Sequence, residues 1–237
     1  MGTDREWCRW GEEDPYFGVI TAEAYRRENL DAAARDAFFR SGREHVEEVL
    51  GVCRRHLAPD FTPRRALDFG CGCGRVALAL AGVAGEVVGV DIAPAMLEEA
   101  RRNCETREVR NARFCTSDDR LSQVSGRFDF VHTFITLQHI PPRRARRLVR
   151  ALLERLEPGG LGMLHVVYAH RLNATTDGLD TLGAQLRPRR LGARLRRLLE
   201  RLDPARKPRM QMRSFPLNAL FFMLQEAGAE SLHLTRS

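Results

Sequence analysis

Residues 66–75 read Ala-Leu-Asp-Phe-Gly-Cys-Gly-Cys-Gly-Arg, and this stretch decides the fold of the chain. Its apolar run ends at Asp68, and glycines then alternate with other residues at Gly70, Gly72 and Gly74. Glycines at this spacing let the backbone turn sharply and approach a ligand without a Cβ in the way. A helix that begins directly after such a turn offers unpaired N–H groups to a ligand carboxylate or phosphate. The stretch therefore predicts a strand, a ligand-binding turn and a helix.

A second apolar strand follows one helix later and ends in an acid, as Val87-Val88-Gly89-Val90-Asp91. A carboxylate at the end of this strand can accept two hydrogen bonds from a ribose diol. The glycine spacing is G-x-G-x-G, which differs from the dinucleotide pattern G-x-G-x-x-G. The two stretches together indicate a nucleoside-type ligand, and the spacing disfavours a dinucleotide oxidoreductase.

The pattern D-x-G-x-G-x-G at residues 68–74 resembles the first motif of the class I S-adenosylmethionine (SAM)-dependent methyltransferases. The resemblance extends from about residue 64 to residue 160, and the segment 128–142 is similar to the type 11/12 methyltransferase subgroup. It implies SAM as the cofactor and S-adenosylhomocysteine (SAH) as the product. It also implies a Rossmann-like, doubly wound and mostly parallel sheet with helices on both faces.

Between residues 65 and 160, short apolar segments alternate with segments of helical periodicity. This alternation predicts βαβ units and a parallel sheet that is buried on both faces. The expected strands are 65–69, 86–90, 112–116, 128–134 and 161–168, and the expected helices between them are 74–84, 94–104 and 142–156.

Four segments are expected along the chain: an N-terminal helical cap at 1–60, a SAM-binding core at 61–169, a basic helical insertion at 170–213, and a C-terminal helix and strand at 214–237 that complete the core. In the insertion, leucines recur at helical spacing among arginines, so one face needs an apolar partner. We expect this insertion to line the acceptor pocket or a homodimer interface.

The N-terminal segment contains both tryptophans, and its second half has helical periodicity. The sequence Ser41-Gly42-Arg43-Glu44 has the form of a capping box, which predicts a helix that begins there. We interpret the segment as a cap over the cofactor, with Tyr16 or Trp10 near the methionine end. A scaffold extension that packs on the sheet is the alternative.

The family resemblance assigns roles to the glycine turn. It implies that Gly70, Cys71 and Gly72 back the methionine moiety of SAM. Asp68 then orders that moiety through water and the ammonium group, and Gly74 completes the turn.

Further cofactor contacts follow from the same resemblance. Arg75 is placed to reach the cofactor carboxylate, with a surface position on the helix as the alternative. Asp91 is expected to hold the ribose hydroxyls. Ile92 and Met96 are placed to sandwich the adenine, although Met96 also suits an ordinary core position.

Two later segments complete the expected cofactor site. Ser117 and Asp118 follow the third strand, where a backbone N–H and a carboxylate are expected to contact the adenine. Thr133 or Gln138, at the end of the fourth strand, is expected to touch the methionine end. His139 is the candidate general base, because an imidazole titrates near neutral pH, and a structural role is its alternative.

Missing motifs narrow the chemistry. The fourth strand is not followed by N-P-P-Y or D-P-P-Y, which disfavours methylation of nucleobase or glutamine amino groups, and 161–168 lacks the carboxylates of metal-dependent relatives. The sulfonium methyl is already activated, so alignment is the main task of the protein. We expect metal-free, in-line methyl transfer to an O or N atom of a small molecule or metabolite-sized peptide.

Composition sets the remaining bounds. The net charge is +7, but all 38 basic residues except Lys207 are arginine, which discounts the charge as a sign of nucleic-acid binding. The six cysteines form no C-x-x-C pair, which disfavours disulfides, zinc and iron–sulfur clusters. The absence of a signal peptide or long apolar run predicts a cytoplasmic protein without membrane contact. Two alternatives stay open: an RNA- or protein-modifying enzyme docking through 187–209, and a non-catalytic SAM-binding subunit.

Overall fold

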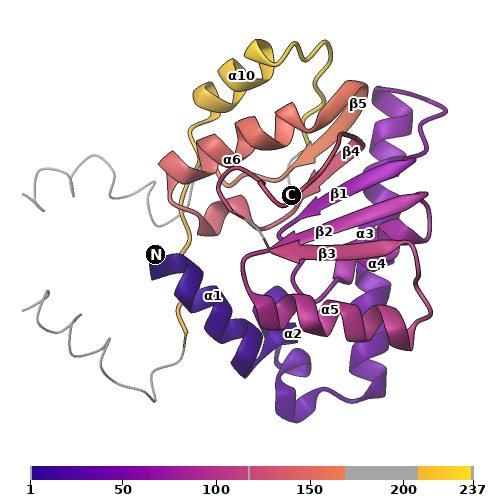
Figure 1. Ribbon diagram of the computed structural model, residues 1–237, viewed down its shortest axis with the longest axis vertical. Helices are drawn as coiled ribbons and strands as arrows, with labels where there is room; N and C mark the ends of the chain where they lie inside the picture. Colours follow the sequence, from indigo (N-terminus) through magenta and orange to yellow (C-terminus); the bar gives the residue numbers. More distant parts are fainter. Residues whose placement is uncertain (1, 117, 169–207, 236–237) are drawn as a thin grey trace, which may run out of the picture.

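A computed structural model describes residues 2–116, 118–168 and 208–235 of the chain (Figure 1). Five strands form one sheet in the order β3-β2-β1-β4-β5, and every neighbouring pair is parallel. The strands are β1 (Arg65–Phe69), β2 (Glu86–Asp91), β3 (Ala112–Thr116), β4 (Phe128–Thr133) and β5 (Leu156–Leu164). The predicted Rossmann-like fold class is confirmed.

Helices cover both faces of the sheet, so the central strands are buried on each side. One face carries α3 (Ala32–His56), α4 (Arg75–Ala81) and α5 (Pro94–Thr106). The other face carries α6 (Pro142–Glu154), with α10 (Leu217–Glu226) packed against it. Alternate residues of β1 serve the two faces, with Leu67 toward α6 and Ala66 toward α4.

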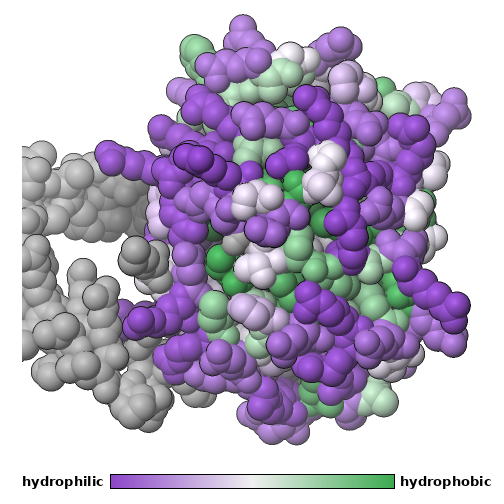
Figure 2. Space-filling view, in the orientation of Figure 1, coloured by the Kyte–Doolittle hydropathy of each residue, from purple (hydrophilic) through white to green (hydrophobic). Residues whose placement is uncertain are grey.

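The N-terminal segment packs against α5 (Figure 1). It contains α1 (Gly2–Glu13), α2 (Pro15–Val19) and two short 3-10 turns at Glu23–Tyr25 and Arg27–Asn29. The close approach depends on two glycines, because a Cβ on Gly11 or Gly18 would lie 3.2 Å or 3.0 Å from side-chain atoms of Met96. Figure 2 shows the molecule in the orientation of Figure 1. Hydrophilic residues cover most of the visible face, and apolar residues lie near its middle.

The start of α3 differs from the prediction. The helix begins at Ala32, after Asp31, whose carboxylate accepts a hydrogen bond of 2.7 Å from the Ala34 N–H. Ser41 lies inside this helix, and its hydroxyl donates to the Phe38 carbonyl. The capping-box prediction at Ser41 was therefore wrong, because Asp31 caps the helix earlier and the helical periodicity simply continues.

Two elements near the C-terminal end also differ. The fifth strand runs from Leu156 to Leu164 rather than over 161–168, with a register shift opposite β4 between Phe128 and Phe130. Residues 231–235 adopt no regular secondary structure, so the strand predicted there is absent from the described part of the chain. Most of the predicted insertion, residues 170–207, lies outside the described residues, and 208–213 contains no helix. No described helix has the length and apolar character needed to cross a bilayer.

Candidate functional site

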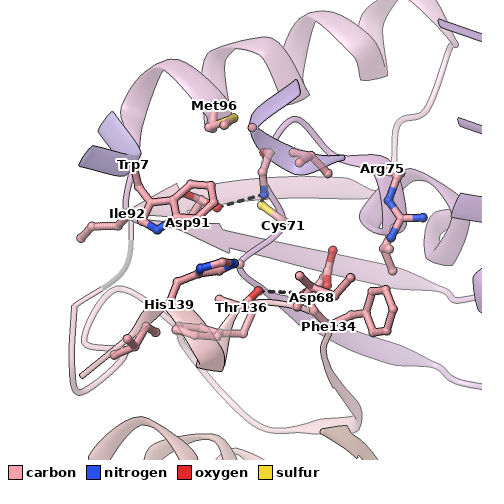
Figure 3. A pocket seen from close by; sticks show the side chains of 18 of the residues that line it. Trp7, Asp68, Cys71, Arg75, Asp91, Ile92, Met96, Phe134, Thr136 and His139 are labelled. Carbon is pink, nitrogen blue, oxygen red and sulfur yellow. Dashed lines mark hydrogen bonds between the residues drawn. The ribbon is translucent and has the colours of Figure 1, made fainter. Parts of the chain in front are cut away.

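A cavity of about 360 Å³ opens at the carboxyl ends of β1, β2 and β4, where open parallel sheets present ligands. Figure 3 shows Trp7, Ile92 and Asp91 at one end of it and Arg75 with Phe134 at the other. Of the residues predicted to bind the cofactor or act on it, those that line the cavity are Asp68, Gly70, Cys71, Gly72, Arg75, Asp91, Ile92, Met96, Asp118 and His139.

The glycine turn is built as its spacing predicts. Gly70 and Gly72 have φ angles of 78° and 53°, which side chains rarely adopt. A Cβ on Gly70 would also collide with Thr136, which follows β4, and one on Gly72 would lie 2.6 Å from Val19 of the N-terminal segment. The turn is therefore the point where β1, the segment after β4 and the N-terminal segment meet.

Asp91 ends β2 and anchors this turn (Figure 3). Its two carboxylate oxygens accept hydrogen bonds from the Gly72 N–H at 3.0 Å and the Ala93 N–H at 2.9 Å. Burial raises the pKa of Asp91, and these backbone hydrogen bonds oppose that rise. Each oxygen of a carboxylate can accept a second hydrogen bond, so Asp91 retains the capacity to receive two hydroxyls from the cavity.

Asp68 is almost completely buried, at 2% exposure, and lies beside His132 in the register of β1 and β4. Its Oδ1 lies 2.8 Å from His132 Nδ1, and its Oδ2 has no hydrogen-bond partner among the described residues. His132 Nε2 in turn lies 2.9 Å from Nε2 of His45 on α3. An unpartnered buried oxygen on a cavity wall is suited to a ligand donor.

Arg75, the first residue of α4, is buried rather than on the surface of the helix, and burial lowers its pKa. Its guanidinium lies 3.4 Å from the Ser41 hydroxyl and 6.0 Å from the ring centroid of Phe134, while its Nε has no hydrogen-bond partner among the residues that the structure describes. Within the part of the chain that the structure describes, Arg75 forms no ion pair. A buried cation without a carboxylate is costly, so this end of the cavity is suited to an anionic group.

His139 lies in the 3-10 turn Leu137–His139 that follows β4. Its Nδ1 is 2.8 Å from the Gln211 carbonyl, and its ring packs against Trp7 with centroids 4.8 Å apart. Because a carbonyl only accepts, Nδ1 carries the proton, and Nε2 of the neutral ring is left as an acceptor. Burial lowers the pKa of His139, so the neutral form prevails at physiological pH.

Arg144 of α6 links the N-terminal helix α1 to the segment after β3 through two ion pairs. Its guanidinium lies 2.8 Å from an oxygen of Asp4 on α1 and 2.7 Å from one of Asp119 after β3. Burial alone would raise the pKa of Asp119, but hydrogen bonds from Arg144 and Arg147 lower it overall. All three residues of the Asp4–Arg144–Asp119 bridge line the cavity.

Two predicted aromatic contacts fall elsewhere. Tyr16 is buried, and its hydroxyl lies 2.8 Å from both Glu99 Oε1 and Asn103 Oδ1 on α5. Trp10 packs against Phe17, with ring centroids 5.6 Å apart. Neither lines the cavity, because α1 and α2 turn both rings toward α5.

Trp7 takes the cavity position instead, one helical turn before Trp10. The tryptophan spacing was visible in the sequence, but the face of α1 that looks into the cavity is set by packing. His132 carried a clearer signal, as a histidine in a strand whose residues 130–131 are apolar. Thr136 had no such signal, because its role depends on the neighbouring glycine turn.

Three other predicted residues do not line the cavity, and Ser117 lies outside the described residues. Gly74 caps α4 with a φ of 90°. Thr133 is fully buried in β4, and its hydroxyl has no hydrogen-bond partner in the described part of the chain. Gln138 is also buried, and its side-chain nitrogen lies 3.4 Å from Nε2 of His139.

Residues 66–160 match a family model described as a methyltransferase domain. The ubiquinone biosynthesis O-methyltransferase of Xanthomonas oryzae is 31% identical over 102 residues, which are 43% of this chain and 42% of that protein. The protein of the same name from Xanthomonas campestris is 33% identical over 97 residues, or 40% of each chain. The chain thus spans less than half the length of these curated relatives.

Two solved structures share the fold. Magnesium protoporphyrin IX methyltransferase from Synechocystis PCC 6803, crystallised with bound SAH, has a TM-score of 0.53 at 19% identity, covering 84% of this chain and 78% of that one. The YcgJ protein from Bacillus subtilis has a TM-score of 0.53 at 23% identity, covering 76% and 68%. Residues 66–160 are therefore similar to a methyltransferase domain, and the described chain shares its Rossmann-like fold with these two solved structures.

Proposed function

We propose that this chain is a SAM-dependent methyltransferase that methylates an O or N atom of a small molecule. The observation that carries the proposal is one cavity with Asp91 at one end and, at the other, the Arg75 guanidinium, which forms no ion pair with any described residue. A ribose diol suits the first group, and the carboxylate of an amino acid suits the second. The methyltransferase domain match and the small-molecule names of the relatives support this assignment.

The residues of the cavity fit the parts of SAM in order. Asp91 would accept the ribose hydroxyls, and Ile92 and Met96 offer apolar surface to the adenine. Asp68 and Arg75 would receive the ammonium and the carboxylate of the methionine moiety. When bound, SAM supplies a methyl group that its sulfonium charge already activates, so the residues of the chain need only bind, orient and exclude water.

His139 is the proposed general base. Its Nδ1–H is held by the Gln211 carbonyl, which leaves Nε2 free of a proton and oriented by the packing against Trp7. An acceptor hydroxyl or amine within reach of Nε2 could pass its proton there as the new bond forms. The lowered pKa keeps this nitrogen unprotonated at neutral pH.

Isothermal titration calorimetry with SAM, SAH and NAD tests the cofactor assignment. We expect SAM and SAH to bind at one site per chain and NAD not to bind. A panel of small hydroxy and amino compounds, assayed for SAH release, then tests the activity. Binding of NAD, or no binding of SAM and SAH to folded protein, would overturn the proposal.

A further inference from the structure

Three histidines from separate elements meet beside the glycine turn, and the proposed function uses none of them. They are His45 on α3, His132 on β4 and His165 directly after β5. The rings of His45 and His165 pack against Phe134, with centroids 4.2 Å and 5.0 Å away. Burying a polar ring costs free energy unless its hydrogen bonds are made. His45 and His132 form such hydrogen bonds, which indicates that they serve the cavity and do not merely fill space.

The hydrogen bonds run in one direction from α3 to β1. Because the Asp68 carboxylate only accepts, His132 Nδ1 must carry a proton, and the neutral ring then accepts at Nε2. His45 must therefore donate to His132 from its own Nε2. Burial, aided by the nearby His132, Arg75 and His165, lowers the pKa of His45 to about 3, so His45 carries a single proton at neutral pH.

These hydrogen bonds leave His132 unable to act on a ligand directly. Both of its ring nitrogens are engaged, one by Asp68 and one by His45, and its side chain is 1% exposed. The effect of the two histidines is therefore exerted through Asp68. They hold Oδ1 and leave Oδ2 of this cavity-lining residue without a partner among the described residues.

The position of Asp68 matters because an unpaired cation lines the same cavity. Arg75 is buried and acts electrostatically on Asp68, yet within the described residues it forms no ion pair with Asp68 or any other acid. Opposite charges buried in one cavity normally pair, since each alone bears a desolvation cost. Here Asp68 is held by His132, while Arg75 contacts the Ser41 hydroxyl and faces the ring of Phe134.

We propose that His132, supported by His45, holds the Asp68 carboxylate away from Arg75, so that both charges stay available to a zwitterionic amino-acid group. Asp68 receives the ammonium of that group and Arg75 its carboxylate. The two histidines are thus positioning residues. This inference rests on the proposed function, because SAM and SAH carry such a group at one end.

The test compares two ligands that differ in that group. SAH carries the amino-acid group, whereas methylthioadenosine has the same nucleoside and sulfur without it. We expect His132→Leu to weaken SAH binding by about tenfold or more, as for the loss of a charge-assisted hydrogen bond, and to leave methylthioadenosine binding unchanged. His45→Leu should act in the same direction with a smaller effect.

Two further variants separate positioning from packing. His45→Gln retains a side-chain N–H that can donate to His132, so it should restore most of the SAH affinity lost in His45→Leu. His165→Leu removes a histidine that packs on the same Phe134 ring but lies outside the hydrogen-bond chain, and it should change neither affinity. Thermal melting confirms that each variant is folded.

The outcomes are distinct. Equal weakening of SAH and methylthioadenosine, or no change in either, would overturn the positioning role. If the wild-type protein binds neither ligand, the proposed function itself fails. Imidazole NMR spectra then still test the hydrogen bonds that join Asp68, His132 and His45. These bonds require a proton on His132 Nδ1 in the wild type, and the His132 ring should become less ordered in His45→Leu. A proton found on Nε2 of His132 instead would reject this arrangement.

Discussion

The floor and the wall of the cavity are built in different ways. The floor consists of the glycine turn at 68–75 and the strand end at 91–96, and its chemistry comes from two short stretches of sequence. The wall consists of Trp7, Ser41, His132 and His139, with His45 behind it, and these residues come from α1, α3, β4 and the turn after β4. The comparison shows that a motif can specify the cofactor floor, while the wall exists only once distant elements pack.

The two regions also differ in how their polar groups are held. In the floor, the carboxylate of Asp91 is fixed by backbone N–H groups of its own and the neighbouring turn. In the wall, each histidine is fixed by another side chain or by a distant carbonyl. Floor substitutions should therefore act directly on cofactor binding. Wall substitutions should act on turnover or stability, or on cofactor binding through the floor residues that they position.

The largest expected effect is on turnover, from His139→Asn in the wall. Loss of a general base lowers kcat by roughly 10²–10⁴-fold, and SAH affinity should change little. In the wild type, kcat should hold as the pH drops through the ordinary histidine pKa of about 6.5 and should fall only at a lower pH, because the folded pKa is lowered and only the unprotonated Nε2 can act. SAH release, measured against pH, checks both the loss of kcat and its pH dependence. His233→Asn is the control. Full turnover in His139→Asn would assign His139 a structural role.

Asp91→Ala in the floor should weaken SAH binding by about 2–3 kcal/mol, because buried hydroxyls and the Gly72 N–H lose a charged acceptor. Calorimetry measures the change. Glu86→Ala is the matched control, since it removes an acid from the opposite end of β2. A loss below about 0.5 kcal/mol would place Asp91 outside the ligand contacts.

Gly42→Ala tests how tightly the wall is packed. A Cβ at Gly42 would collide with the Arg75 carbonyl, so α3 and α4 must separate, which lowers the free energy of unfolding by about 1–3 kcal/mol. Gly51→Ala on the same helix is the control, because no described atom outside the backbone of its own helix turn lies within 4 Å of its Cβ position. That variant should gain roughly 0.5–1 kcal/mol from helix propensity. Equal melting temperatures for the two variants would contradict the close packing.

Arg144→Gln tests whether the ion pairs of Arg144 hold α1 in place beside the cavity. The Arg144 side chain is only 23% exposed and bridges Asp4 to Asp119, so its loss should release α1 at a cost of about 1 kcal/mol. Hydrogen exchange should rise within residues 2–13, and SAH affinity should fall. Arg146→Gln on the exposed side of α6 should leave both unchanged. Unaltered exchange in Arg144→Gln would show that α1 is held by its apolar contacts alone.

The smallest effect concerns stability against pH. The pKa of His45 is lowered to about 3 in the folded state, so its contribution is complete above about pH 6.5 and is lost as the pH falls toward 3. His139 and His165 shift in the same direction. The melting temperature should therefore decline less steeply with acid in His45→Leu than in the wild type. Parallel declines would mean that His45 titrates alike in the folded and unfolded chain.

Most of the sheet and much of the floor were predictable because both depend on local patterns. Apolar runs bounded by glycines mark β1 and β2, and the glycine turn needs its residues in direct succession. The start of α3 was missed because Ser41-Gly42-Arg43-Glu44 has the form of a cap while Asp31 performs the capping. Tyr16 and Trp10 were predicted to lie in the site because the sequence shows that they are aromatic. The sequence does not show on which side of α1 and α2 they lie.

The sequence by itself determined the Rossmann-like fold class, the glycine turn and the acid at the end of β2. These features are local, since backbone conformation and the alternation of strands with helices follow from residue type and spacing over a few neighbours. Only the tertiary structure brought His45 to His132, Trp7 to His139 and Arg144 to Asp4. Those contacts join residues far apart in the chain, and their geometry depends on how α1, α3 and α6 pack around the sheet. Whether Asp68 meets His132 or Arg75 is decided at that level, because burial and hydrogen-bond geometry choose between partners that the sequence offers equally.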